Sequence, residues 1–224
     1  MKNKVSCIIP AYNEESRIAN VLKVVENHPI LDEVIVINDG STDKTADVIR
    51  RFKVTFIDKK KNQGKSIAVM TGIQKSKGDI IIMLDSDLSG LTKKNVTDLV
   101  NPVLKNEADM TLSLRGNSLL IYKLFGNDFI SGERAFRRDF IKNYNVLKKL
   151  PGYGIESFYN EQAIKKKYRI KIVDFSNVIL ANKSDKIGFW KGNWGEIKMV
   201  MQIFKMIGFF RFFYIFFKMN SMRV

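Results

Sequence analysis

The stretch Ile80-Ile81-Ile82-Met83-Leu84-Asp85-Ser86-Asp87 places five apolar residues directly before two carboxylates. A continuous apolar run of this length is typical of a strand that is buried in a parallel sheet. Two carboxylates at the end of a buried strand carry a desolvation cost that packing alone does not offset, and a divalent cation would neutralise them. Mg²⁺ and Mn²⁺ both prefer carboxylate and phosphate oxygens. Taken alone, such a triplet more often marks an acidic turn or a helix cap.

Strand and helix patterns alternate on the N-terminal side of this stretch. Strands are predicted at 5–9, 34–37 and 54–57, and helices at 14–27, 41–51 and 65–76. Strands that alternate with helical segments of 10–15 residues form βαβ units. The sequence therefore predicts an α/β fold with a largely parallel central sheet flanked by helices. On the C-terminal side, strands are expected at 110–114 and 170–178, and a helix at 155–167.

Polar or turn-forming clusters follow three of the predicted strands. They are Pro10-Ala11-Tyr12-Asn13-Glu14, Asn38-Asp39-Gly40-Ser41 and Asp85-Ser86-Asp87. Ligands of open parallel sheets bind beyond the carboxyl ends of the strands, so the three clusters are expected to converge on one site.

In this order, the clusters resemble the opening pattern of the family 2 glycosyltransferases: P-x-Y-N-E, then D-G-S-x-D, then D-x-D. The stretch Asn62-Gln63-Gly64-Lys65 is similar to the N-x-G-K stretch of that family. The resemblance covers residues 4–115 closely. It implies a GT-A-type domain, placed here at 1–195, that uses a nucleotide-sugar donor and a divalent cation, Mg²⁺ or Mn²⁺.

The resemblance also implies roles for individual residues, and the side chains suit them. Tyr12 offers a ring face to a base, Glu14 and Asp39 offer acceptors to a base or ribose, and Lys65 offers a cation to a diphosphate. Asp87 is expected to bind the metal and to be catalytic. The expected donor-binding residues are Pro10, Ala11, Tyr12, Glu14, Asp39, Lys65, Asp85 and Ser86. The family often has two aspartates before the glycine; here the first is Asn38, which leaves Asp39 alone to serve the nucleoside.

Two later segments resemble the acceptor side of the glucosyl-3-phosphoglycerate synthase-like branch and, more loosely, of polyprenyl-phosphate sugar transferases. They cover residues 131–138 and 151–156. The resemblance implies acceptor-side roles for four residues: Gly132, Arg134, Tyr153 and Gly154. Glu133 and Glu156 are the only carboxylates in these segments, and either is a candidate to bind sugar hydroxyls or act as a catalytic base. Asp128 is a further candidate, and Arg137-Arg138 fit a solvated helix face equally well.

Relatives in that branch have a metal-binding histidine just before a lysine-rich stretch that corresponds to residues 180–189. No histidine stands there in this chain. His28, the only histidine, is expected at the surface. The metal is therefore expected to rest on Asp87, the diphosphate and water.

Charge is distributed unevenly along the 224 residues, which carry a net +15. Residues 131–224 hold 19 Lys and Arg against 7 Asp and Glu. This excess would attract a phosphorylated acceptor or acidic lipid, although a bias in codon usage is an alternative. No nucleic-acid-binding motif is present, so no nucleic-acid partner is expected. The single cysteine, Cys7, lies in an apolar run and is expected to be a buried thiol in a reducing compartment. No signal peptide is recognised at Met1, so the cytoplasmic face of a membrane is the expected location.

The last segment is strongly apolar. Residues 199–217 contain seven Phe and one Tyr, interrupted by a few basic and polar residues. A spanning helix would bury those charges at a cost of about 2.5–3.5 kcal/mol each. We therefore expect residues 196–224 to form an amphipathic tail at the membrane interface. A contact with a second copy of the chain and packing on its own domain are the alternatives.

Together these features predict a metal-dependent transfer of a sugar from a nucleoside diphosphate, expected to be UDP, to a lipid, polyprenyl-phosphate or other phosphorylated acceptor. Nucleotidyl transfer is one rival, but the glycine-rich and basic loop typical of it is missing after the first strand. The other rival is a non-catalytic sugar- or membrane-binding module of the same fold. The presence of both Asp85 and Asp87 argues against it.

Overall fold

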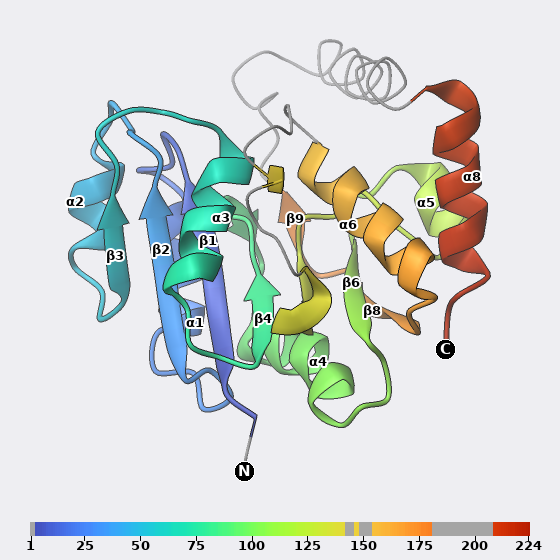
Figure 1. Ribbon diagram of the computed structural model, residues 1–224. Coiled ribbons are helices and arrows are strands. Elements are labelled where there is room, and N and C mark those ends of the chain that lie inside the picture. The colour runs from blue at the N-terminus through green and yellow to red at the C-terminus, as the bar shows by residue number, and fades with distance from the viewer. Residues whose placement is uncertain (1–2, 142–145, 148–153, 181–207) are drawn as a thin grey trace.

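A computed structural model describes residues 3–141, 146–147, 154–180 and 208–224, except the side chains of Ile121 and Phe209 (Figure 1). Within these ranges, one central sheet has the strand order β3 (Thr55–Asp58), β2 (Glu33–Asn38), β1 (Val5–Ala11), β4 (Ile80–Met83), β7 (Arg134–Arg137), β6 (Met110–Arg115) and β8 (Ile170–Phe175). β1 to β4 run parallel to one another, and β6 runs parallel to β8. The predicted α/β fold with a largely parallel sheet is confirmed.

Helices cover both faces of this sheet because its strands are apolar on both sides. Along β1, Ile8 packs into one core cluster and Cys7 and Ile9 into the other, as the alternation of side chains in a strand requires. One face is covered by α3 (Lys65–Lys75), α6 (Gly154–Lys166) and α8 (Phe209–Asn220), and the other by α1 (Ile18–Val25) and α4 (Lys93–Leu104). Smaller elements are α2 (Thr45–Ile49), α5 (Leu120–Phe125), η1 (Arg138–Phe140) and the paired strands β5 (Leu88–Ser89) and β9 (Ile179–Leu180).

Strand β7 is antiparallel to both of its neighbours, β4 and β6. Residues 131–138, which include β7, resemble an acceptor-side stretch in sequence, and a solvated helix face is the alternative expectation for Arg137-Arg138. That alternative is wrong, since Arg137 ends β7 and Arg138 donates to the carbonyl oxygens of Gly78 (2.6 Å) and Ile73 (3.2 Å) at the end of α3.

The described part of the tail packs on the rest of the chain. Phe212, Ile215, Phe216 and Met219 on one face of α8 are buried in the same core cluster as α3 and α6. The last residues continue this attachment, because the Val224 N–H donates to the carbonyl of Ile170 at 3.0 Å. Packing on its own domain, one of the three alternatives, is therefore what residues 208–224 show. The boundary proposed at 195–196 and residues 199–207 lie outside the described ranges.

No helix in the described ranges is both long enough and apolar enough to cross a bilayer. Cys7 is buried as expected, and burial raises the pKa of its thiol. The expectation for His28 is wrong, because its side chain is buried. Its Nε2 lies 3.0 Å from the Lys93 carbonyl and its Nδ1 accepts the Ile30 N–H, so the ring joins the end of α1 to the start of α4.

Candidate active site

The carboxyl ends of β1, β2 and β4, which are neighbours in the sheet, meet at one edge (Figure 1). A cleft of about 350 Å³ opens at this edge. The cleft is lined by Pro10, Ala11, Tyr12, Glu14, Asp39, Asn62, Lys65, Ala68, Asp85, Ser86, Asp87 and Leu180. All eight residues expected to bind the donor, together with Asp87, lie in this lining. The predicted convergence of the three strand ends is confirmed.

Asn13 braces two of the loops that shape the cleft. It adopts a left-handed backbone with φ of 56°, a conformation that asparagine tolerates better than most residues. Its N–H donates to Ser41 Oγ and its side-chain oxygen accepts the Thr42 N–H, both at 2.9 Å. The next N–H, of Glu14, donates to Thr45 Oγ1 at 2.7 Å. The motif residues after β1 thus fix the loop after β2.

Asp39 organises the loop that leads into α3. Its nearly buried carboxylate accepts the backbone N–H groups of Gln63 (3.0 Å) and Gly64 (2.7 Å) and pairs with Lys59 Nζ at 2.5 Å. The sequence-based role for Asp39 was direct contact with the nucleoside. The structure adds that much of the hydrogen-bonding capacity of this carboxylate already holds the cleft wall.

Asn38 has a partner that an aspartate would repel. Its side-chain amide donates to Asp58 Oδ1 at 2.7 Å, across the β2–β3 pair, while its oxygen accepts from Ser41. A carboxylate at position 38 would face the carboxylate of Asp58. The departure from the family pattern at this position therefore has a local electrostatic reason.

These contacts predict unequal effects of two neighbouring alanine substitutions. Asp39→Ala should weaken UDP binding about tenfold or more, because two backbone N–H groups and Lys59 lose a charged acceptor worth about 1.5–3 kcal/mol per bond. Asn38→Ala should act mainly on the β2–β3 edge and change UDP binding by less than threefold. Titration calorimetry with UDP on both variants measures this, and equal losses would show that the loop held by Asp39 does not shape the nucleotide site.

Lys65, the first residue of α3, joins two carboxylates that are far apart in sequence. Its Nζ lies 2.8 Å from Asp85 Oδ1 and 2.8 Å from Glu156 Oε1 on α6. Burial alone would lower the pKa of Lys65, but the two carboxylates raise it above its ordinary value, so the amine stays charged. Lys65 thus presents a fixed cation in the cleft.

The two aspartates of the D-x-D triplet have opposite electrostatic surroundings. Burial disfavours the charge of Asp85, but Lys65 and then Arg115 hold its pKa below the usual value. At Asp87, burial and then the charges of Asp85 and Glu14 act together and raise the pKa to about 7. A cation beside Asp87 would relieve this repulsion.

The donor set at Asp87 fits a hard divalent cation, since it consists of carboxylate oxygens that repel one another. Within the part of the chain that the structure describes, no group of three or more acidic, histidine or cysteine side chains is arranged to hold a metal. The expectation that a diphosphate and water complete the metal site stays a prediction.

Gly132 brings the predicted acceptor-side segment against the D-x-D triplet. A Cβ at this position would lie 2.4 Å from Asp85 Oδ2, so no larger residue fits without displacing that carboxylate. The resemblance implied an acceptor-side role for this glycine. In the structure it admits the carboxylate of Asp85.

Glu133 and Arg134 lie in the interior and do not line the cleft. Glu133 accepts from Ser113 Oγ and Ser131 Oγ, both at 2.7 Å. The Arg134 guanidinium donates to the carbonyl of Ser131 and lies over the Tyr159 ring, 5.1 Å from its centroid. Both were expected to face substrate, Glu133 as a candidate base and Arg134 on the acceptor side. β7 lies in the middle of the sheet, where both faces are covered.

The other acceptor-side predictions concern α6. Glu156 is nearly buried and paired with Lys65, so it lies behind the cleft wall. Gly154 begins α6 and is buried, and Tyr153 lies outside the described residues. The helix therefore reaches the site through Glu156 and its bond to Lys65.

Sequence analysis missed Arg115, the last residue of β6. Its guanidinium lies 3.3 Å from Asp128 Oδ2 and 3.6 Å from Glu133 Oε1, and its charge also lowers the pKa of Asp85. Asp128, a further candidate base in the sequence, accepts from Ser118 Oγ and is buried. Its position could have identified Arg115 as a site residue, because it directly follows a predicted strand, as the other site residues do.

Residues 6–147 match the family model described as Glycosyl transferase family 2. The chain belongs to this family. The matched residues include β1, β2 and β4, whose ends form the cleft, and the whole D-x-D triplet.

This family 2 chain is similar to parts of longer curated proteins. It is 36% identical over 100 residues to a dolichyl-phosphate beta-glucosyltransferase from Trichomonas vaginalis, a match that covers 38% of this chain and 29% of that protein. It is 38% identical over 102 residues to 4,4'-diaponeurosporenoate glycosyltransferase from Staphylococcus aureus, covering 43% and 27%. The chain thus matches less than a third of the length of either relative.

Solved structures share the fold of this family 2 chain. Glucosyl-3-phosphoglycerate synthase from Mycobacterium tuberculosis, in complex with Mn²⁺, UDP-glucose and phosphoglyceric acid, aligns with a TM-score of 0.68 and 24% identity over 83% of this chain and 75% of that one. Its complex with UDP gives a TM-score of 0.64 and 25% identity over 77% and 70%. The expected GT-A-type architecture is confirmed.

Proposed function

We propose that this family 2 member transfers a sugar from a nucleoside diphosphate donor, with a divalent cation, to a lipid, polyprenyl-phosphate or other phosphorylated acceptor. The observation that carries the proposal is the meeting of Tyr12, Lys65 and Asp85-Ser86-Asp87 in one cleft. An aromatic face, a fixed cation and paired carboxylates suit the three parts of such a donor: base, diphosphate and metal.

The comparisons support the donor class. The structural neighbour has been crystallised with Mn²⁺, UDP and UDP-glucose. The two curated relatives carry names of a glucosyltransferase and a glycosyltransferase whose named substrates are lipid-soluble, one of them a dolichyl phosphate. We infer a UDP-sugar as donor from the first point and a lipid-linked or phosphorylated acceptor from the second.

Each cleft residue has a defined part in the proposed reaction. The half-exposed ring of Tyr12 stacks on the base, and Asp39 keeps the loop before α3 in place beneath the nucleoside. Asp87 would hold the cation together with the diphosphate oxygens; when bound, the cation supplies positive charge that stabilises the departing diphosphate. Lys65 adds a second positive charge, and its two carboxylate partners keep it from moving as charge develops.

A screen of nucleotide sugars tests the proposal. The chain should be stabilised against thermal unfolding by one or more UDP-sugars with Mn²⁺ or Mg²⁺, and less by the same ligands with chelator. A ligand at 100 times its Kd should add about 2.7 kcal/mol, which corresponds to a shift of roughly 5–10 °C for a domain of this size.

The released product separates the proposal from its rivals. Sugar transfer or donor hydrolysis liberates UDP from the UDP-sugar, whereas nucleotidyl transfer consumes a nucleoside triphosphate, supplied with a sugar phosphate in a parallel reaction, and liberates pyrophosphate from it. A non-catalytic module would be stabilised by the donor and would release neither. If no nucleotide sugar shifts the unfolding temperature and no UDP is released, the proposed donor is wrong.

A further inference from the structure

Exposed large apolar side chains are concentrated in one region of the described chain. Two of them, Tyr12 and Ile179, lie at or next to the cleft lining. The others all belong to α5, α8 and the C-terminus: Leu120, Leu124, Phe125, Phe210, Tyr214, Phe217 and Val224. Scattered single apolar residues need no explanation, but this grouping on two elements does.

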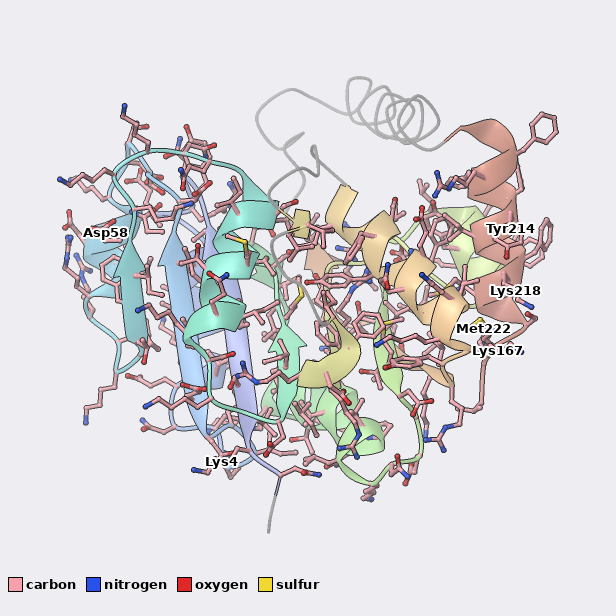
Figure 2. All side chains as sticks on the ribbon, in the orientation of Figure 1. Lys4, Asp58, Lys167, Tyr214, Lys218 and Met222 are labelled. Carbon is pink, nitrogen blue, oxygen red and sulfur yellow. The ribbon has the colours of Figure 1, made fainter. Side chains whose placement is uncertain are left out.

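The two helices form one surface, which we call the α5–α8 face. Phe125 on α5 contacts Phe217 on α8, with ring centroids 6.4 Å apart, and Arg223 donates to the Phe125 carbonyl at 2.8 Å. Leu120 and Leu124 are one helical turn apart on α5, as are Tyr214 and Phe217 on α8. Figure 2 shows Tyr214 and Lys218 on α8, at the edge of the molecule farthest from β3.

The α5–α8 face is not a displaced part of the core. The opposite side of α8 already fills the core with Phe212, Ile215, Phe216 and Met219, so the helix is held in place. Leu124 remains 75% exposed and Tyr214 58% exposed in this arrangement. Their apolar surface lacks a cover within the described chain and suits an external apolar phase.

Charge indicates which phase that is. Lys123 on α5, Lys218 on α8 and Arg223 are all exposed beside the apolar side chains. A second copy of the chain would oppose these cations with the same cations, whereas anionic lipid headgroups would pair with them. Apolar and aromatic side chains with lysines at their margin are the composition of interfacial membrane-binding helices.

We propose that the α5–α8 face docks on the surface of an anionic lipid bilayer, with Leu124 and Tyr214 inserted between headgroups and Lys123 and Lys218 paired with them. The sequence placed membrane contact in residues 199–217. The surface proposed here instead comprises α5 and the exposed side of α8.

The docking face is joined to the cleft by a short path. Asn117, three residues before Leu120, donates to the Leu180 carbonyl at 2.9 Å and accepts the Leu180 N–H at 3.1 Å. Leu180 lines the cleft. If the proposed function holds, docking sets the side of the cleft lined by Leu180 toward the bilayer, where a lipid-linked acceptor can enter without leaving the membrane.

Vesicle co-flotation of the full chain tests the docking. The wild-type chain should float with vesicles that contain 30% phosphatidylserine in phosphatidylcholine, on the order of tenfold more than with phosphatidylcholine alone. The double variant Leu124→Gln/Tyr214→Gln, with one polar substitution on each helix, should lose most of the floating fraction on acidic vesicles. Both sites are exposed, so its unfolding temperature should match that of the wild type.

Charge reversal gives a matched pair. Lys218→Glu should reduce flotation with acidic vesicles several-fold, whereas Lys4→Glu, at an exposed lysine just before β1 and away from α8 (Figure 2), should leave it unchanged. The proposal is overturned if the wild type does not float with acidic vesicles, or if the double variant floats as the wild type does.

Two further measurements separate this proposal from its alternatives. If the wild type sediments as a dimer and does not float with acidic vesicles, and the double variant sediments as a monomer, the face is a contact between copies of the chain. The thermal shift by a UDP-sugar in the absence of lipid reports on the proposed function alone. It should be the same in the wild type and the double variant.

Discussion

Asp87→Ala should lower metal-dependent turnover of the nucleotide sugar about a hundredfold or more and leave the fold intact. The carboxylate of Asp87 is the cleft group best suited to hold a cation, because burial and the charges of Asp85 and Glu14 raise its pKa to about 7. The same repulsion opposes folding when no cation is bound. Removing the carboxylate should therefore leave the unfolding temperature of the ligand-free chain unchanged or higher, while the added stability from donor and metal is lost.

Turnover with and without chelator, together with thermal unfolding, measures both parts of this expectation. Asp47→Ala is the control, because Asp47 is an exposed carboxylate that pairs with Arg50 on α2, outside the cleft. Full activity in Asp87→Ala, or activity of the wild type that chelator does not change, would show that no metal acts at this carboxylate.

Gly40→Ala should lower the free energy of unfolding by about 3 kcal/mol. Gly40 has φ of +71°, and an added Cβ would lie 2.4 Å from the carbonyl carbon of Lys61 and 2.5 Å from the nitrogen of Asn62. These are backbone atoms of the loop that Asp39 holds, so they cannot rotate away as a side chain would. For a domain of this size, the loss corresponds to roughly 6–12 °C in unfolding temperature.

Gly126→Ala is the matched control for backbone strain. Gly126 also has a left-handed backbone, with φ of +62°, but its added Cβ would meet only the end of the Arg223 side chain, at 3.2 Å. This variant should lose about 1 kcal/mol. Equal losses at the two glycines, measured by denaturant unfolding, would mean that the loops after β2 and β3 are not packed as closely as the structure shows.

The sequence by itself determined the N-terminal half of the sheet and the contents of the cleft. The runs at 5–9, 34–37 and 80–84 are short and almost wholly apolar, as buried strands are. The helices predicted between them act as crossover connections, which make the strands pair in parallel. Once pairing is parallel, residues that follow the strands must share one edge. The sequence alone therefore places Tyr12, Asp39 and Asp85 together.

The roles of individual polar residues were decided only by tertiary structure. Whether Glu133 faces substrate or the interior depends on where the strand that follows it inserts, and that strand, β7, enters between β4 and β6 against the direction of its neighbours. The pairing of Lys65 with Glu156, 91 residues later, depends on which helix covers that edge. The spacing of apolar residues along the sequence does not predict these contacts, because hydrogen bonds and ion pairs between distant segments leave no repeat in the sequence.

The C-terminal tail also separates what composition predicts from what only the tertiary structure decides. Composition identified an aromatic segment that could not be wholly exposed to water; it favoured lipid as the environment of the rings and left a second copy and the chain's own core as alternatives. In the fold, the rings of α8 are divided between the core and the surface, because only the side of α8 that packs on the core cluster is buried. Phe212 and Phe216 are buried there, whereas Tyr214 and Phe217 remain outside, for the physical reason that a helix packed on a surface can bury only the side that contacts it.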